Sequence, residues 1–492
     1  MDGNTMPFLD ESVWSGKIYL SDWVAGSAGT RTVTAPADGS AVAVVGEASA
    51  ADLADAARKA AAAQPAWEAT APEARAAILN RAASVLEENA EELMPWIIRE
   101  SGSIPPKAGI EIQHSAGFLR AAAEAATQGG ATSLPSVDGR EAEEQLIRVA
   151  HGVVGVISPF NFPLILSIRA IAAALATGNA VVHKPDPRTP VSGGVMIARA
   201  FQEAGLPEGL LHIVPGGADV GVAMCEDPNI AMVSFTDSPE IGARVGEACG
   251  RNLKKVQLEL GGKNALIVMD DADIDVAASN AAWGAWLHQG QICMATGLIL
   301  APAALAPQLA EALAAKAQAL PVGDPAKEQC ALGPLIVEAE ATRIKAIVDD
   351  AVAQGAVLHA GGAPNGTMFP ATVLSGVRPG MRAFDEEIFG PVAVVASYED
   401  DDDAVALANR TEFGLVGSVI GRDVAGAKAL GMRLKVGHLH INDQTVTASP
   451  LAPFGGRGRS GNGSRISGPA IWEEFTQYLW VTIKPEATPY PF

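Results

Sequence analysis

The chain has 492 residues, with 35 Lys and Arg against 56 Asp and Glu, so its formal net charge is −21. This excess of acid argues against nucleic-acid binding, because contacts to phosphate need clustered Lys and Arg side chains. With 48% hydrophobic and 18% charged residues, the composition also excludes intrinsic disorder. At roughly 150 residues per domain, the length suggests about three structural units.

Cysteine usage and the N-terminal segment indicate the compartment. Cys225, Cys249, Cys293 and Cys330 are too few and too far apart for a disulfide-stapled scaffold or a CxxC site, and we expect no metal centre. The first residues, MDGNTMPFLDESVW, lack the basic and apolar regions of a signal peptide. The most apolar stretch is interrupted by prolines and an arginine, unlike a membrane span. We therefore expect a cytoplasmic protein without membrane or nucleic-acid partners.

The N-terminal third predicts hairpins followed by helices. Short β-branched pieces separated by Gly, Ser and Thr predict hairpins at the start, and Ala-rich patterns predict helices over 51–89 and 106–126. Residues 127–149 predict a protruding β-hairpin with Asp138 and Gly139 at its turn.

Two series of alternating strands and helices follow. Over 152–257, apolar strands such as GVVGVIS and AVVHK alternate with helices, which indicates a parallel sheet covered on both faces. A second series begins at Val256 with VQLEL and continues to HLHIN, before a Gly-rich segment and a last strand, YLWVTI. The sequence therefore predicts an α/β protein with two doubly wound parallel-sheet domains and a small hairpin-and-tail element.

Four short segments carry residue types suited to chemistry. HQGQICMATG places Cys293 among residues that are poor packing material for a core strand. LELGGK places Glu259 at a strand end, either as a buried paired acid or as a general base poised by desolvation. SPFNFP places Asn161 where its amide either donates to an oxyanion or forms an Asx turn. EEIFGP places Glu387 and Phe389 before a Gly-Pro turn.

The order and spacing of these segments resemble the NAD(P)-dependent aldehyde dehydrogenase superfamily over nearly the whole chain. SPFNFPLILSIR, VVHKPDPRTP and LHQGQICMATG resemble its bacterial benzaldehyde and vanillin dehydrogenases most closely. The resemblance implies a dinucleotide-binding domain over 1–126 and 150–256 and a catalytic domain over 257–440. It also implies an oligomerisation hairpin and tail strand, 127–149 and 470–492, in a homodimer or homotetramer.

The resemblance implies a covalent mechanism. Cys293 would attack the aldehyde carbon as a thiolate, and the Asn161 amide with the Cys293 backbone N–H would hold the oxyanion. Hydride would pass to the cofactor, and Glu259 would activate the water that hydrolyses the thioester. The product would be a carboxylate.

The resemblance also assigns binding residues. The cofactor is expected to be NAD, with NADP possible, and its expected residues are Ile157, Ser158, Pro159, Phe160, Lys184, Gly217, Ser238, Gly242, Leu260, Glu387 and Phe389. The tunnel for the small-molecule aldehyde is expected near Phe162, Leu166, Ile292, Met294 and Phe454. Aromatic and thioether side chains suit a flat ring.

Several positions depart from the family pattern or stay open. Asp237 stands where glycine is expected, and its charge should repel a nearby pyrophosphate unless it is paired or turned away. Pro187 replaces a glutamate of NAD-selective members, which leaves NADP use open. Leu298 stands where arginine is frequent. Arg169 either pairs with an acid or faces the tunnel and binds a polar ring substituent.

Three other functions compete with aromatic aldehyde oxidation. The same chemistry on aliphatic aldehydes or a semialdehyde would favour a convergent Arg/Ser pair, for which Arg169 is the candidate. An enzyme that passes the acyl group to coenzyme A would usually lack Glu259. A non-catalytic binding or structural relative should have lost Cys293, Glu259 or Asn161, and all three are present.

Overall fold

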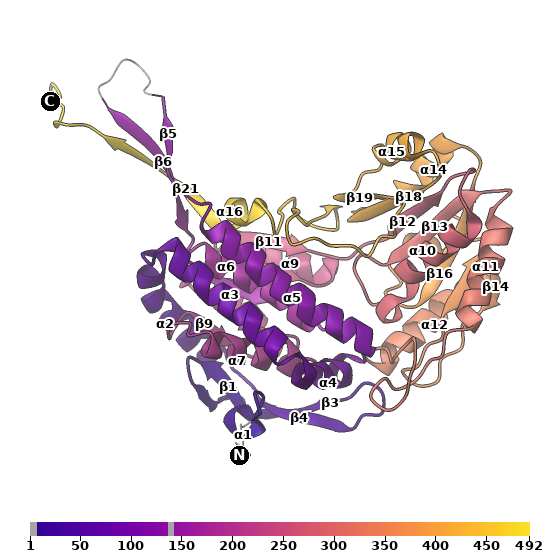
Figure 1. Cartoon of the computed structure of the whole chain (residues 1–492), viewed down its shortest axis with the longest axis horizontal. Helices are drawn as coiled ribbons and strands as arrows, with labels where there is room; N and C mark the ends of the chain where they lie inside the picture. Colours follow the sequence, from indigo (N-terminus) through magenta and orange to yellow (C-terminus); the bar gives the residue numbers. More distant parts are fainter. Residues whose placement is uncertain (1–6, 136–141) are drawn as a thin grey trace.

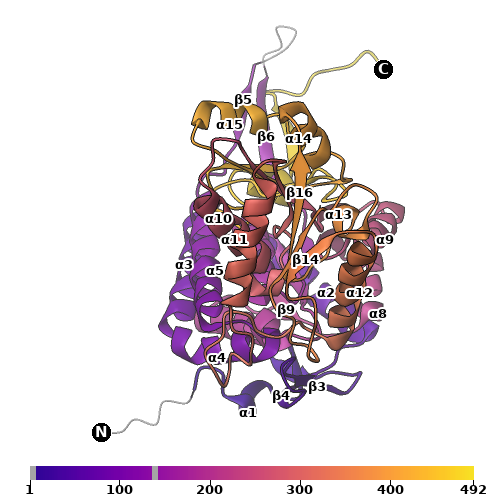
Figure 2. The ribbon, with the colours of Figure 1, turned by 90° about the vertical axis from the view of Figure 1, so that its right-hand side faces the viewer.

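The computed structural model describes residues 7–135 and 142–492 and shows two α/β lobes (Figure 1). Within these residues, a three-stranded antiparallel sheet projects from the first lobe (Figures 1 and 2). The turn expected at Asp138 and Gly139 lies outside the described residues. The predicted α/β class, with two sheet domains and a small additional element, is confirmed.

The first lobe is built around a seven-stranded sheet of the described residues. In spatial order its strands are β11 (Lys255–Glu259), β10 (Ile230–Thr236), β7 (Val153–Ile157), β8 (Ala180–Lys184), β9 (Leu211–Ile213), β1 (Lys17–Leu20) and β2 (Trp23–Ala25). The strands from β11 to β9 are parallel, whereas β1 and β2 form an antiparallel edge. The central strands are buried along their length, because helices cover both faces.

Two groups of helices cover this sheet. On one face, α2 (Ala50–Glu68), α8 (Ala218–Glu226) and α9 (Pro239–Arg251) pack together. The other face carries α6 (Pro163–Ala176) and α7 (Met196–Glu203), over which pack α3 (Pro72–Glu88), α4 (Ala90–Ser101) and α5 (Pro105–Ala126). The short α1 (Glu11–Trp14) precedes β1, and the π-helical turn η1 (Val191–Val195) leads into α7.

Local sequence sets the bounds of the N-terminal helices. Ser49 and Asp52 form a capping box at the start of α2, which satisfies its first backbone N–H groups. Pro72 starts α3, where its missing N–H costs nothing. Gly102 ends α4 in the left-handed conformation, at φ 67°. The helical pattern over 51–89 thus forms two helices, and α4 lies outside the predicted ones.

Strand β11 belongs to the first sheet, so the assignment of VQLEL to the second series is wrong. β11 pairs in parallel with β10, and Thr236 lies opposite Glu259 at the carboxyl ends of both strands. The second sheet begins at Asn264, so the boundary between the sheets falls after Glu259 and not at residue 256. The pattern locates a strand in the sequence but not its partner, because parallel partners are distant in the chain.

The second lobe contains another seven-stranded sheet of the described residues. In spatial order its strands are β14 (Val357–Ala360), β15 (Thr372–Ser375), β16 (Val392–Tyr398), β13 (Thr296–Pro302), β12 (Asn264–Val268), β18 (Val416–Ile420) and β19 (His438–Ile441). All neighbours are parallel except β14 with β15. One face carries α10 (Ile274–Trp286) and α11 (Ala306–Gln318), and the other α12 (Glu338–Ala353), α13 (Arg382–Asp385), α14 (Asp401–Ala408) and α15 (Val424–Gly431).

Alternate residues of the central strands enter separate hydrophobic cores on the two faces. Along β13, Leu298 and Leu300 pack in one core and Ile299 in the other, as the twofold repeat of a strand requires. Leu298, at the position where the related family often has arginine, is 3% exposed. Its apolar side chain completes a core in which an unpaired guanidinium would be costly.

The remaining strands form smaller pairings. β5 (Thr132–Leu134), β6 (Glu143–Ala150) and β21 (Thr476–Ile483) form the projecting sheet, with α16 (Ala470–Phe475) at its base. β3 (Thr30–Thr34) pairs with β4 (Ala41–Gly46), and β17 (Phe413–Gly414) pairs with β20 (Arg457–Gly458). In the described part of the chain, no helix is both long and apolar enough for a membrane crossing.

Candidate active site

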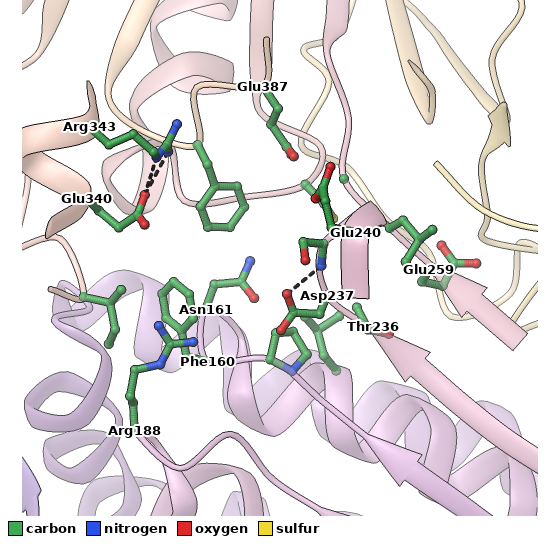
Figure 3. A pocket seen from close by; sticks show the side chains of 18 residues that line it. Phe160, Asn161, Arg188, Thr236, Asp237, Glu240, Glu259, Glu340, Arg343 and Glu387 are labelled. Atoms are coloured by element: carbon green, nitrogen blue, oxygen red, sulfur yellow. Dashed lines mark hydrogen bonds and ion pairs between the residues drawn. The ribbon is translucent and has the colours of Figure 1, made fainter. Parts of the chain in front are cut away.

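A cavity of about 380 Å³ lies between the two lobes, at the carboxyl ends of β7, β10 and β11 (Figure 3). The first lobe contributes Phe160 and Asn161 after β7, and Glu259 at the end of β11. The second lobe contributes Cys293 and Glu387. The carboxyl ends of parallel strands are where open α/β sheets bind ligands, because the loops there diverge and leave a crevice.

The structure brings together all three residues predicted to be catalytic, because Cys293, Glu259 and Asn161 line this one cavity. The predicted cofactor and substrate residues in the same lining are Pro159, Phe160, Leu166, Ser238, Leu260, Glu387 and Phe389. The predicted residues outside this lining are Ile157, Ser158, Phe162, Lys184, Gly217, Gly242, Ile292, Met294 and Phe454.

Part of the cavity wall is formed by residues outside the four motifs. The lining residues that the sequence did not predict include Thr236, Glu240, Ile336, Glu340 and Arg343. Glu340 and Arg343 lie one turn apart on α12 and form an ion pair of 2.8 Å. Such pairs are common on solvated helix faces, so no signal in the sequence distinguished this one.

The loop that carries Cys293 follows a strained 3₁₀ turn, η2 (Leu287–Gly290). His288 and Gln289 have φ values of 49° and 55°, which are costly for residues with side chains. The turn leads Cys293 to the cavity wall, where Asn264 Nδ2 donates to its carbonyl oxygen at 2.8 Å. The backbone around the thiol is therefore tightly held.

The environment of the Cys293 thiol favours its protonated form near neutral pH. Burial raises its pKa to about 12, against the lowering effect of the Arg169 guanidinium, and Glu387 and Glu259 raise it further. A nucleophilic role therefore requires a nearby base that accepts the proton as the thiolate forms.

Glu259 is a buried carboxyl group of the cavity wall that can serve as this base. The side chain is 2% exposed, and its Oε1 accepts a hydrogen bond of 3.3 Å from Gln257 Nε2. Its Oε2 has no hydrogen-bond partner among the described residues. Burial raises the pKa of Glu259 to about 8, against the lowering effects of Arg169 and Arg465. A carboxyl group with a free oxygen and this pKa is suited to proton transfer near neutral pH.

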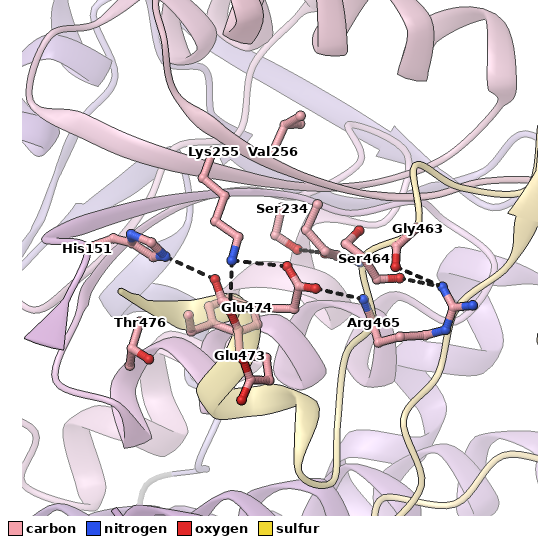
Figure 4. A network of polar contacts seen from close by, with 12 residues as sticks. His151, Ser234, Lys255, Val256, Gly463, Ser464, Arg465, Glu473, Glu474 and Thr476 are labelled. Atoms are coloured by element: carbon pink, nitrogen blue, oxygen red, sulfur yellow. Dashed lines mark hydrogen bonds and ion pairs between the residues drawn. The ribbon is translucent and has the colours of Figure 1, made fainter. Parts of the chain in front are cut away.

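A polar network fastens the strand that carries Glu259 to the terminal helix (Figure 4). Lys255, on the same strand, forms an ion pair of 3.2 Å with Glu474 of α16. The other oxygen of Glu474 accepts from the Arg465 backbone N–H at 3.2 Å, and His151 Nε2 donates to the Glu474 carbonyl oxygen at 3.0 Å. The base of the projecting sheet and the Gly-rich segment are thus tied to this wall of the site.

Asn161 is fixed at two points. Its Nδ2 donates to the carbonyl oxygen of Gln291, just before Cys293, at 2.8 Å. The backbone carbonyl oxygen of Asn161 accepts a hydrogen bond from Lys107 Nζ at 2.7 Å. An amide NH₂ carries two hydrogens, so one remains for a further acceptor. The side chain bonds to a distant segment, which speaks against the Asx-turn alternative.

Glu387 is tied to the loop after β11. The Gly262 backbone N–H donates to Glu387 Oε1 at 2.9 Å, and Lys263 Nζ donates to the Ala383 carbonyl oxygen at 2.8 Å. Burial raises the pKa of Glu387 to about 7 and lowers that of Lys263 to about 7. These contacts join the LELGGK and EEIFGP motifs beside the cavity.

Two charged residues of the cavity wall, Arg188 and Asp237, form hydrogen bonds with neighbouring protein groups. Arg188 contacts both carboxylate oxygens of Asp186, at 2.8 and 2.6 Å, and lies 4.2 Å from the ring centroid of Phe160. Asp237 accepts from the backbone N–H of Ser238, its neighbour, at 2.5 Å. The unusual Asp237 thus holds an N–H at the start of α9, where the related family places the pyrophosphate.

Arg169 faces an aromatic ring of the predicted tunnel. The residue is 5% exposed, and its guanidinium carbon lies 4.6 Å from the ring centroid of Phe454. Its Nε has no hydrogen-bond partner among the described residues. The other predicted tunnel residues, all buried or half-buried, are Phe162, Leu166, Ile292 and Met294. A cation held against a ring is stabilised by its π face and leaves donors for a substrate.

Four of the predicted cofactor residues, Ile157, Lys184, Gly217 and Gly242, are outside the cavity lining. Ile157 and Lys184 end the paired strands β7 and β8, and Lys184 is 8% exposed. Gly217 is the N-cap of α8. A Cβ atom at Gly242 would overlap the side chain of Leu260, so a glycine there allows α9 to approach the loop after β11.

The chain is similar to known proteins along almost its whole length. The model of the aldehyde dehydrogenase family matches residues 23–481. Vanillin dehydrogenase from an Amycolatopsis species is 49% identical over 99% of this chain and 100% of that protein. The NAD(+) benzaldehyde dehydrogenase of Pseudomonas putida is 45% identical over 98% of this chain and 99% of that protein.

A solved structure shows the same similarity in three dimensions. The crystal structure of a salicylaldehyde dehydrogenase from Pseudomonas putida G7, complexed with salicylaldehyde, matches with a TM-score of 0.93 at 34% sequence identity. The match covers 97% of this chain and 99% of that one. Fold and sequence comparisons therefore agree.

Proposed function

The chain belongs to the aldehyde dehydrogenase family, and on this basis we propose that it oxidises an aromatic aldehyde to the carboxylic acid with NAD as the oxidant. The observation that carries the proposal is that Cys293, Glu259 and Asn161 line one cavity. The names of the relatives, vanillin, benzaldehyde and salicylaldehyde dehydrogenase, support the aromatic substrate.

The side chains divide the reaction between them. Cys293 loses its proton, for which Glu259 is the nearby acceptor, and its sulfur bonds to the aldehyde carbon. The second Asn161 Nδ2 hydrogen and the Cys293 backbone N–H donate to the oxyanion that forms. When bound, the nicotinamide ring supplies the hydride acceptor for the oxidation to a thioester. Glu259, once deprotonated again, takes a proton from the attacking water, and the Cys293 thiolate leaves the carboxylic acid product.

The residues present fit a nicotinamide dinucleotide. Glu387 and Phe389 would hold its nicotinamide end, and Lys184 its adenosine ribose. A Cβ atom at Gly261 would overlap the Glu387 carboxylate, so this glycine allows Glu387 to sit at the cavity. Pro187 provides no carboxylate to repel a 2′-phosphate, so NADP also works in this proposal, with NAD preferred.

An aromatic substrate suits the apolar side chains of the predicted tunnel, of which Leu166 lines the cavity together with Cys293. Phe162, Leu166 and Phe454 offer flat or apolar surface of the kind that lines small-molecule sites. Arg169, over the Phe454 ring, would donate to a hydroxyl or methoxy substituent. The same buried cation favours a second candidate, a semialdehyde whose carboxylate pairs with Arg169.

The absorbance of the reduced cofactor tests the proposal. The protein is assayed with NAD and with NADP on benzaldehyde, vanillin, salicylaldehyde, hexanal and succinate semialdehyde. The proposal expects the highest kcat/KM for an aromatic aldehyde with NAD. A preference for succinate semialdehyde would establish the second candidate, and reduction of neither cofactor by any aldehyde would refute both.

Replacing Asn161 by Ala is expected to lower kcat by on the order of 10²–10³, because one oxyanion donor is lost. Steady-state rates with benzaldehyde measure this effect. Asn280→Ala is the control, since the Asn280 amide is exposed and bonds to its own helix at Val276. A near-native kcat for the Asn161 variant would show that its amide does not serve the oxyanion.

We also propose that the protein is a cytoplasmic homodimer or homotetramer. Strand β21 exposes Tyr478, Leu479 and Trp480 at 56%, 48% and 63%, an apolar surface on a projecting sheet. The four cysteines of the chain are free thiols, which is the state that a reducing compartment favours. Sedimentation velocity should give a multiple of the 50.5 kDa chain mass, and a monomer at micromolar concentration would contradict the assembly.

A further inference from the structure

Helix α5 carries a completely buried ion pair close to the cavity. Lys107 and Glu111 lie one turn apart, are 1% and 0% exposed, and place Nζ 2.5 Å from Oε2. Removing two charges from water costs more than their mutual attraction returns, unless further hydrogen bonds complete the geometry. The other partners of the pair therefore indicate what it positions.

All of these partners belong to the segment from Asn161 to the first turn of α6. Lys107 Nζ donates to the carbonyl oxygen of Asn161 at 2.7 Å and lies 4.1 Å from the ring centroid of Phe162. The second oxygen of Glu111 accepts from the backbone N–H of Leu164 at 2.8 Å. The ammonium thus faces a carboxylate, a carbonyl oxygen and an aromatic ring, each of which stabilises its buried charge.

Asn161 is consequently held from both ends. Gln291, in the loop of the nucleophile, accepts from its Nδ2, whereas Lys107 holds its backbone carbonyl. The first contact sets the direction of the amide, and the second sets the position of the main chain from which the amide projects. A displacement of about 1 Å at a catalytic group can cost on the order of 10²-fold in rate.

We propose that Lys107, held by Glu111, is a positioning residue for the oxyanion-binding amide of Asn161 and determines the rate of acyl transfer through it. The inference rests on the proposed function, because it assumes that the Asn161 amide stabilises an oxyanion. Lys107 itself does not touch the substrate, since its nitrogen is enclosed by protein groups. A purely structural role would stabilise the fold without any link to Asn161.

Two substitutions separate positioning from folding. Lys107→Met keeps the unbranched chain and removes the charge and the donor. Lys107→Met/Glu111→Gln also removes the charge that would otherwise be left unpaired, and keeps an acceptor oxygen for Leu164. The double variant carries the test if the single variant does not fold. Lys107→Gln, which keeps a donor for Asn161, should recover part of the lost rate.

Each substitution is made in the native chain and in the Asn161→Ala variant. In the native chain, we expect kcat for benzaldehyde to fall by about tenfold or more while the dissociation constant for NAD stays unchanged. In the Asn161→Ala background, we expect a further loss of less than about twofold, because interacting groups are not additive. Calorimetric titration with NAD provides the readout that is independent of turnover.

Arg75→Met is the matched control. Arg75 is also a buried cation of the first lobe, 6% exposed, and donates to the carbonyl oxygens of Ala176 and Thr70 instead. Its replacement should lower the unfolding temperature and change kcat by the same factor in both backgrounds. The contrast between the two cations isolates the link to Asn161.

Equal losses in the two backgrounds, or a native kcat in the folded double variant, would overturn the positioning role of Lys107. Failure of the proposed function has a different signature. If Cys293→Ala still oxidises aldehydes, the covalent mechanism fails whatever the Lys107 variants do. A native enzyme that depends on Cys293 but shows additive Lys107 losses would reject this inference alone.

Discussion

Cys293→Ala should abolish aldehyde oxidation, with a loss of on the order of 10⁴–10⁶ in kcat, as expected when a covalent nucleophile is removed. NAD binding should persist, because the change removes one sulfur atom and leaves Glu387 and Lys184 in place. Steady-state reduction of NAD measures the first effect, and calorimetric titration with NAD measures the second.

Cys330→Ala is the matched control for this variant. Cys330 is half-buried, and its thiol donates to the Gly323 carbonyl oxygen at 3.5 Å, outside the cavity lining. The control should keep native kcat. A Cys293 variant with turnover within about tenfold of native would assign the chemistry to another group.

Glu259→Gln should separate acylation from thioester hydrolysis. The variant keeps the size of the side chain but cannot accept a proton from water, so we expect steady-state turnover to fall by on the order of 10²–10⁴. Stopped-flow mixing with NAD and benzaldehyde should show a burst of reduced cofactor that is slower than the native burst, because Glu259 also accepts the Cys293 proton, but still faster than the turnover that follows. A burst as slow as the steady state would show that thioester hydrolysis is not the step that depends most on Glu259.

The pH dependence supplies a second readout for Glu259. Burial raises its pKa to about 8, so the ionised base is scarce below that pH and predominates above it. Steady-state kcat of the native enzyme should therefore rise with pH through about 8, and Glu259→Gln should lose this rise. Glu386→Gln, an exposed carboxyl group paired with Arg382, is the control and should keep the native profile.

The candidate catalytic motifs could be recognised in the sequence because each is a short, continuous segment. Cys293, Glu259 and Asn161 sit in short segments whose order and spacing are distinctive, and the structure places all three on one cavity. The predicted tunnel residues are not all found in this cavity, because Phe162 and Phe454 are outside its lining. Tunnel walls are made by side-chain directions, which a motif does not specify.

Some groups of the site gave no recognisable pattern. Glu340 and Arg343 line the cavity but are spaced like an ordinary solvated helix pair. Lys107 and Glu111 have an equally ordinary i,i+4 spacing, yet they are completely buried beside Asn161. Whether an i,i+3 or i,i+4 pair faces water or an active site depends on the packing around its helix.

The sequence by itself determined the α/β class, most helices and strands, and which residues are the candidate nucleophile, base and oxyanion-binding amide. Periodicity and capping report local conformation, so α2 begins at its capping box and α3 at its proline. Tertiary structure alone decided that β11 joins the first sheet, that Arg169 lies over Phe454, and that Lys107 holds Asn161. Each of these is a contact between segments that are distant in the chain. A local residue pattern does not specify which distant segment a residue will contact.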